Sequence, residues 1–69
     1  MKAKTSIDCG NLIRGRRKAL EMSGPELAQK LGVQPQTLRV WECGRQWPGP
    51  KQIRQLAAIL GCDPLDFLP

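Results

Sequence analysis

Apolar residues return every three or four positions in four stretches of the chain, which is the spacing of a helix face that packs on a core. The pattern predicts helices over about residues 8–21, 24–31, 35–43 and 50–60, and a last short helix from residue 64. We expect no strand, so the fold class is all-α, a compact domain of five helices. The residues expected in its core are Ile13, Leu20, Met22, Leu27, Ala28, Leu31, Val33, Leu38, Trp41, Ile53, Leu56, Ala57, Leu60 and Leu65.

Residues that favour helix ends separate these segments. Ser23 and Glu26 have the spacing of a capping box at the start of the second helix. Gly32 can take the left-handed conformation that ends a helix. Asp8 is the expected N-cap of the first helix, and Asp63 that of the last. The second and third helices are therefore predicted to be short and to be joined by a tight turn.

The helix over residues 35–43 has two different sides. Leu38 and Trp41 lie on the side that packs against the core. The other side carries Gln36, Arg39, Val40 and Cys43, at the i, i+3, i+4 and i+7 spacing of one helix face. We expect this second face to be available to a partner outside the chain.

Length and charge narrow the possibilities further. A chain of 69 residues is long enough for one small domain, here predicted over residues 8–69. Residues 1–7, MKAKTSI, are predicted to be a flexible basic arm that either contacts nucleic acid or is a frayed terminus. The net charge of +5 favours a polyanionic partner, although many small domains are basic without binding nucleic acid.

Several kinds of chemistry are not expected. Three cysteines without a Cys-x-x-Cys pair, and no histidine, argue against a metal site or a disulfide framework. This cysteine usage, together with the absence of an apolar signal segment, predicts a cytoplasmic setting and no membrane partner. No nucleophile elbow, phosphate loop or paired carboxylates can be found, so we expect no enzyme activity, no cofactor and no small-molecule substrate.

One long run resembles a known family. The segment LAQKLGVQPQTLRVWECGRQWPGP is similar to the core of the Cro/repressor-type (xenobiotic-response-element-like) helix-turn-helix family of phage and bacterial transcriptional regulators. The matching positions are Leu27, Ala28, Leu31, Gly32, Val33, Trp41, Glu42, Gly44 and Pro48, and the match extends to Ile13, Arg14, Arg17 and Leu68. The resemblance implies a lambda-repressor-like DNA-binding domain with its helix-turn-helix at the second and third helices.

The resemblance also implies roles for individual residues. The third helix would enter the major groove of double-stranded DNA. The implied base-reading residues are Gln34, Pro35, Gln36, Arg39 and Val40. The implied phosphate-binding residues are Arg17, Gly24, Thr37, Arg45, Gln46 and Trp47, with Gly24 and Trp47 acting through backbone N–H groups. Arg17 would also form a structural ion pair with Glu42.

The function implied is a sequence-specific transcriptional regulator, expected to be a repressor that binds as a homodimer. The alternative is a protein-interaction module of the same fold, such as an antitoxin or adaptor subunit, with Phe67 in its docking surface. The candidate dimer residues are Ile59, Leu65, Phe67 and Leu68. For Leu65 and Leu68, burial in the core is the alternative.

Overall fold

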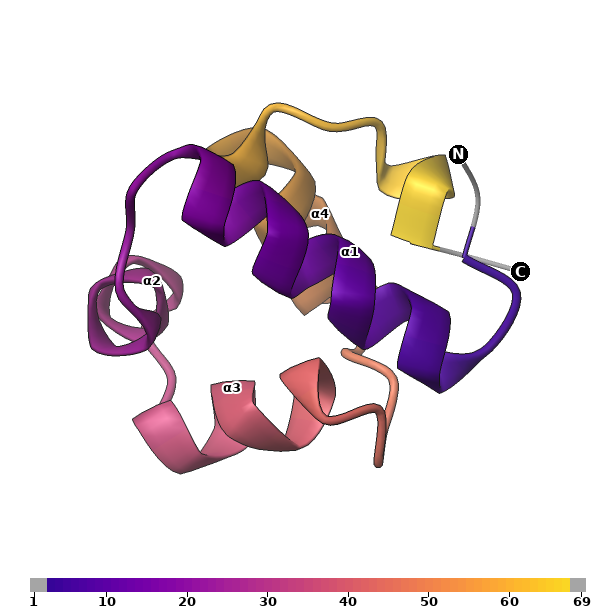
Figure 1. Ribbon diagram of the computed structural model, residues 1–69, viewed down its shortest axis with the longest axis horizontal. Helices are drawn as coiled ribbons and strands as arrows, with labels where there is room; N and C mark the ends of the chain where they lie inside the picture. Colours follow the sequence, from indigo (N-terminus) through magenta and orange to yellow (C-terminus); the bar gives the residue numbers. More distant parts are fainter. Residues whose placement is uncertain (1–2, 68–69) are drawn as a thin grey trace.

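Four α-helices and one turn of 3-10 helix form the part of the chain that the computed structural model describes, residues 3–67. The elements are α1 (Ser6–Ala19), α2 (Gly24–Leu31), α3 (Pro35–Glu42), α4 (Pro50–Leu60) and η1 (Pro64–Phe67) (Figure 1). These residues contain no strand, as predicted. The five-helix prediction is corrected in its last element, because η1 is a single 3-10 turn.

The packing of the helices places α3 at the edge of the molecule. α1 and α2 each contact both α3 and α4, and η1 packs on α4. The core lies where these four α-helices meet. One side of α3 closes this core, while its other side lies on the surface below α1 and α2 in the view of Figure 1.

Most of the residues predicted to lie in the core are buried. The buried hydrophobic residues are Ala3, Cys9, Ile13, Leu27, Ala28, Leu31, Leu38, Trp41, Ile53, Leu56, Ala57, Leu60 and Phe67. Two core predictions are wrong, since Leu20 is 45% and Leu65 57% exposed. Met22 and Val33, also predicted in the core, are half-buried against it.

The error at the C-terminal end concerns which side of η1 faces the core. Residues two positions apart point in different directions in a 3-10 helix as in an α-helix, so Leu65 and Phe67 cannot both face inward. Phe67 points inward and is fully buried, whereas Leu65 points to solvent. The predicted cap is present, because Asp63 Oδ1 accepts a hydrogen bond of 2.9 Å from the backbone N–H of Leu65. Leu68 lies outside the described residues.

The first helix begins two residues earlier than predicted. Thr5, and not Asp8, is the N-cap, and its Oγ1 accepts a hydrogen bond of 3.1 Å from the backbone N–H of Asp8. Ala3 is buried, and its N–H donates to the backbone oxygen of Asp66 at 2.8 Å. The predicted arm over residues 1–7 is thus corrected for residues 3–7, which belong to the domain. Residues 1 and 2 lie outside the description.

The end of α1 contains a residue in an unfavourable conformation. Glu21 has φ +55°, and it is the one non-glycine residue with positive φ among those described. The turn is closed by hydrogen bonds from Glu21 N to Lys18 O (2.9 Å) and from Met22 N to Arg17 O (3.0 Å). This is the position at which glycine normally ends a helix, because glycine has no Cβ to clash there.

We therefore expect Glu21→Gly to stabilise the protein. The left-handed conformation costs a non-glycine residue roughly 1–2 kcal/mol, and the greater freedom of glycine in the unfolded chain offsets part of the gain. The free energy of unfolding in urea should rise by about 0.5–1 kcal/mol. Glu21→Ala is the matched control, since it removes the side chain but keeps the strain. A gain from alanine equal to that from glycine would contradict this explanation.

Candidate nucleic-acid interface

The α2–turn–α3 unit has the helix ends that the sequence predicts. Ser23 Oγ accepts a hydrogen bond of 3.2 Å from Glu26 N, and Glu26 Oε1 accepts one of 3.1 Å from Ser23 N. These hydrogen bonds lower the pKa of the Glu26 carboxyl. Gly32, at φ +71°, ends α2, and α3 then starts with Pro35 in its first position. The start of α2 is thus fixed by its capping box, and the turn between α2 and α3 by Gly32 and Pro35.

The outer side of α3 is the predicted partner face. Leu38 and Trp41 are 2% and 6% exposed and lie in the core. Residues on the opposite side line a surface hollow of about 180 Å³, together with one residue of the following loop. We call this surface the α3 face, and it consists of Gln36, Arg39, Val40, Cys43 and Arg45. The structure therefore brings together three of the five predicted base-reading residues, Gln36, Arg39 and Val40.

The other predicted contact residues surround the α3 face or lie away from it. Gln34 and Pro35 are exposed at the start of α3, and Gln46 is exposed in the loop after it. Thr37 is half-buried on α3, Trp47 is half-buried against the core, and Gly24 is the first residue of α2. None of these six residues lines the hollow.

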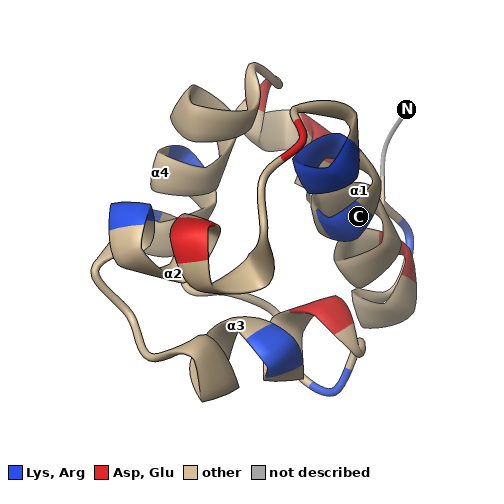
Figure 2. Ribbon diagram, turned by 60° about the vertical axis from the view of Figure 1, so that its left-hand side comes forward, with Lys and Arg blue, Asp and Glu red and all other residues tan. Residues whose placement is uncertain are grey.

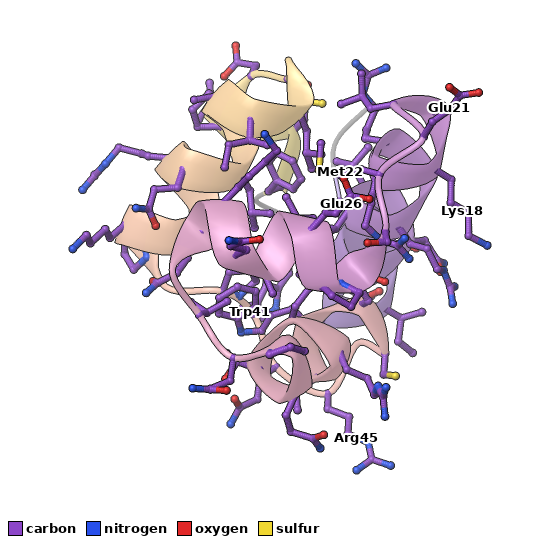
Figure 3. All side chains as sticks on the ribbon, turned by 90° about the vertical axis from the view of Figure 1, so that its left-hand side faces the viewer. Lys18, Glu21, Met22, Glu26, Trp41 and Arg45 are labelled. Carbon is purple, nitrogen blue, oxygen red and sulfur yellow. The ribbon has the colours of Figure 1, made fainter. Side chains whose placement is uncertain are left out.

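Two cations give the α3 face a positive charge. Arg39 and Arg45 are both exposed, and neither forms an ion pair with a carboxylate among residues 3–67. Figure 2 shows basic positions on α3 and on the loop that follows it. In Figure 3, Arg45 extends outward from the rim of the molecule, while Trp41 lies inside it. Unpaired guanidinium groups at a surface suit the binding of phosphates or of guanine edges.

The implied ion pair between α1 and α3 is present. Arg17 Nε donates to Glu42 Oε2 at 2.8 Å, and Arg17 Nη2 donates to Glu42 Oε1 at 3.0 Å. Arg17 Nη1 also donates to the backbone oxygen of Met22 at 2.9 Å. The hydrogen bond to Glu42 raises the pKa of Arg17 above its usual value. Each of the three guanidinium nitrogens of Arg17 thus donates a hydrogen bond within the protein, which gives Arg17 a structural role, and its contact with phosphate stays a prediction.

Two further residues of α1 hold the C-terminal end of α3, and the sequence did not single them out for this. Ser6 Oγ donates a hydrogen bond of 2.7 Å to the backbone oxygen of Gly44. Gly10 packs so closely on α3 that a Cβ there would lie 2.5 Å from Trp41 O and 2.6 Å from Glu42 O. A glycine inside a helix can indicate a close contact with another helix. Gly15 is also inside α1, but nothing lies within 4 Å of its Cβ position, so glycine alone does not identify the contact.

Neither a metal-binding group nor a membrane-spanning helix is found in the described part of the chain. Within residues 3–67, no group of three or more His, Cys, Asp or Glu residues could hold a metal ion. The same residues contain no helix with the length and apolar character that a membrane span requires. The three cysteines are free, and burial raises the pKa of the Cys9 thiol to about 11, so that this thiol stays protonated at neutral pH.

Comparison with known proteins identifies one family. Residues 13–67 match the family model described as helix-turn-helix, which spans the chain from the middle of α1 to the end of η1. No curated protein and no solved structure matches the chain. The matched residues include the whole of the α2–turn–α3 unit.

Proposed function

Because the chain belongs to the helix-turn-helix family, we propose that it is a transcriptional regulator that inserts α3 into the major groove of double-stranded DNA. The observation that carries this proposal is the α3 face, where two unpaired arginines lie beside a polar and an apolar side chain on one exposed surface. We further propose that the protein belongs to the Cro/repressor-type subfamily and that it represses transcription by occupying a promoter.

The side chains of α3 suit the edges of bases. Arg39 can donate two hydrogen bonds to guanine, Gln36 can pair with adenine through its amide, and Val40 can contact a thymine methyl group. Gln34 and Pro35 would lie near the bases at the start of the helix. These contacts would provide sequence discrimination, whereas phosphate contacts would set the position of the protein on the duplex.

Phosphate contacts would come from Arg45 in the α3 face and from residues outside this face. Arg45 and Gln46 are exposed in the loop after α3, and Thr37 has a hydroxyl on α3 itself. The backbone N–H groups of Gly24, at the start of α2, and of Trp47 would add uncharged donors, as helix starts and loops do for anions.

We also propose that the protein binds as a homodimer, because one module of this size reads few base pairs. A dimer would bind a pseudo-palindrome with half-sites about 34–36 Å apart. The fully buried Phe67 is withdrawn from the candidate dimer contacts. Leu65, which is exposed, and Ile59, which is half-buried, remain as candidates at the C-terminal end of the domain.

A selection from random duplexes by gel shift, repeated at low and physiological salt, tests the function. Enrichment of a palindromic motif is the result expected of a sequence-specific dimer. Affinity should fall about 10³-fold between 50 and 200 mM salt if the dimer neutralises ~6 phosphates. Absence of retardation at either salt would contradict the proposal and favour a protein-interaction module of the same fold.

Arg39 and Arg45 should differ in what their removal does. Arg39→Ala should lose about 1–3 kcal/mol of discrimination at one base pair. Arg45→Ala should weaken binding to all sequences alike and lower the slope of log affinity against log salt by about one. The affinities of both variants for the selected duplex and for a scrambled duplex, measured by titration at several salt concentrations, give the discrimination and the salt slope. The two variants remove the same charge and so control for each other, and identical behaviour would mean that Arg39 reads no base.

A further inference from the structure

The peptide unit that leads out of α3 into Arg45 has a defined geometry. Gly44, at φ +78°, closes the helix with hydrogen bonds from Gly44 N to Trp41 O and from Arg45 N to Val40 O, both 3.1 Å long. The carbonyl of this peptide belongs to Gly44 and its N–H to Arg45. Whatever holds the Gly44 carbonyl therefore also sets the direction in which Arg45 leaves the helix.

A residue far away in the sequence holds that carbonyl. Ser6 Oγ donates to Gly44 O at 2.7 Å from the first turn of α1, 38 residues away. The neighbouring residue adds a steric contact, since a Cβ on Gly44 would lie 2.7 Å from the Cα of Ile7. The backbone of the loop is thus fixed from two sides, by a hydrogen bond and by close packing.

We propose that Ser6 is a positioning residue for DNA binding, which acts by holding the Gly44–Arg45 peptide so that the Arg45 guanidinium is presented to a phosphate. This inference rests on the proposed function. Arg45 is exposed and has no carboxylate partner among the described residues, so only its backbone is ordered by the protein. Without the Ser6 hydrogen bond, the loop would keep its contacts with α3 and Ile7 but lose the restraint on the Gly44 carbonyl, and the remaining freedom of this peptide would have to be removed during binding, which lowers affinity.

The expected effect is modest and specific. A partly buried hydrogen bond between neutral groups contributes an amount equivalent to about three- to tenfold in an equilibrium constant. Ser6→Ala should weaken binding by about that factor in the wild-type background. In the Arg45→Ala background the same change should alter affinity less than about twofold, because the group that Ser6 positions is gone.

The test is a double-mutant cycle with two further variants. Affinity for a mixed-sequence duplex of about two helical turns is measured at low salt by fluorescence anisotropy, and stability by urea unfolding. Ser6→Thr keeps the hydroxyl and should bind like the wild type. Thr5→Ala is the matched control, because it removes the neighbouring hydroxyl and the N-cap of α1 but no contact with the loop. It should lower the midpoint of unfolding and leave affinity unchanged.

Each outcome bears on the inference. The expected result is that Ser6→Ala lowers affinity, whereas Ser6→Thr and Thr5→Ala do not. In the Arg45→Ala background, Ser6→Ala should have almost no effect. An equal loss in both Arg45 backgrounds, an equal loss from Thr5→Ala, or no rescue by threonine would overturn the positioning role while leaving DNA binding in place. If the wild-type protein binds no duplex even at low salt, the proposed function fails, and this inference fails with it.

Discussion

Gly10→Ala is expected to lower the free energy of unfolding by about 2–3 kcal/mol, even though alanine is the better helix former. The added Cβ would lie 2.5 Å from Trp41 O and 2.6 Å from Glu42 O. Both are backbone atoms, which cannot rotate out of the way as a side chain can. The substitution must therefore push α3 away from α1, and urea unfolding measures the loss.

Gly15→Ala is the matched control in the same helix. Nothing lies within 4 Å of the Cβ position at Gly15, which is exposed. The higher helix propensity of alanine should then raise stability by about 0.5–1 kcal/mol. The two substitutions are chemically identical, so opposite signs isolate the contact between α1 and α3. If Gly10→Ala also stabilised the protein, the close approach of these helices would be refuted.

Removal of one partner of the ion pair should have an effect of similar size. The Arg17 and Glu42 side chains are 13% and 11% exposed, so each charge depends on the other for most of its solvation. Glu42→Ala leaves the Arg17 guanidinium with Met22 O as its remaining partner among the hydrogen bonds described. We expect a loss of about 3 kcal/mol, the lower end of the range for buried pairs, because some water still reaches both groups.

A double variant separates the value of the pair from the penalty of an unpaired charge. Replacement of both residues by apolar ones, Arg17→Met with Glu42→Leu, leaves no charge unpaired and often costs little. We expect this variant to be at least about 1 kcal/mol more stable than Glu42→Ala alone in the same urea experiment. A double variant as unstable as the single one would mean that the pair itself, through its two parallel hydrogen bonds, stabilises the fold.

Local sequence signals predicted the central part of the fold correctly. The capping box at Ser23 and the glycine at position 32 each act through the backbone of their own helix, so a few neighbouring residues determine the outcome. The face of α3 could also be predicted, because helical periodicity separates Leu38 and Trp41 from Arg39 without knowledge of the neighbouring helices.

The errors occur where two candidates compete or where distant residues meet. Thr5 and Asp8 are both good N-caps, and the sequence alone does not decide between them. The earlier start at Thr5 goes together with the burial of Ala3, whose N–H donates to Asp66 O in η1, 63 residues later in the chain. At the other end, Leu65 and Phe67 lie on different sides of η1, and contacts with the rest of the fold bury Phe67. The contacts of Ser6 and Gly10 with α3 could not be predicted, since they join residues more than thirty positions apart.

The two sides of α3 are chemically independent. Leu38, Trp41 and Glu42 fix the helix in the domain, while Gln36 and Arg39 are exposed and take no part in that packing. Exposed substitutions of this kind usually change stability by less than about 0.5 kcal/mol. Evolution or a designer can therefore exchange the outward residues to change what the protein recognises, while the scaffold that presents them stays the same.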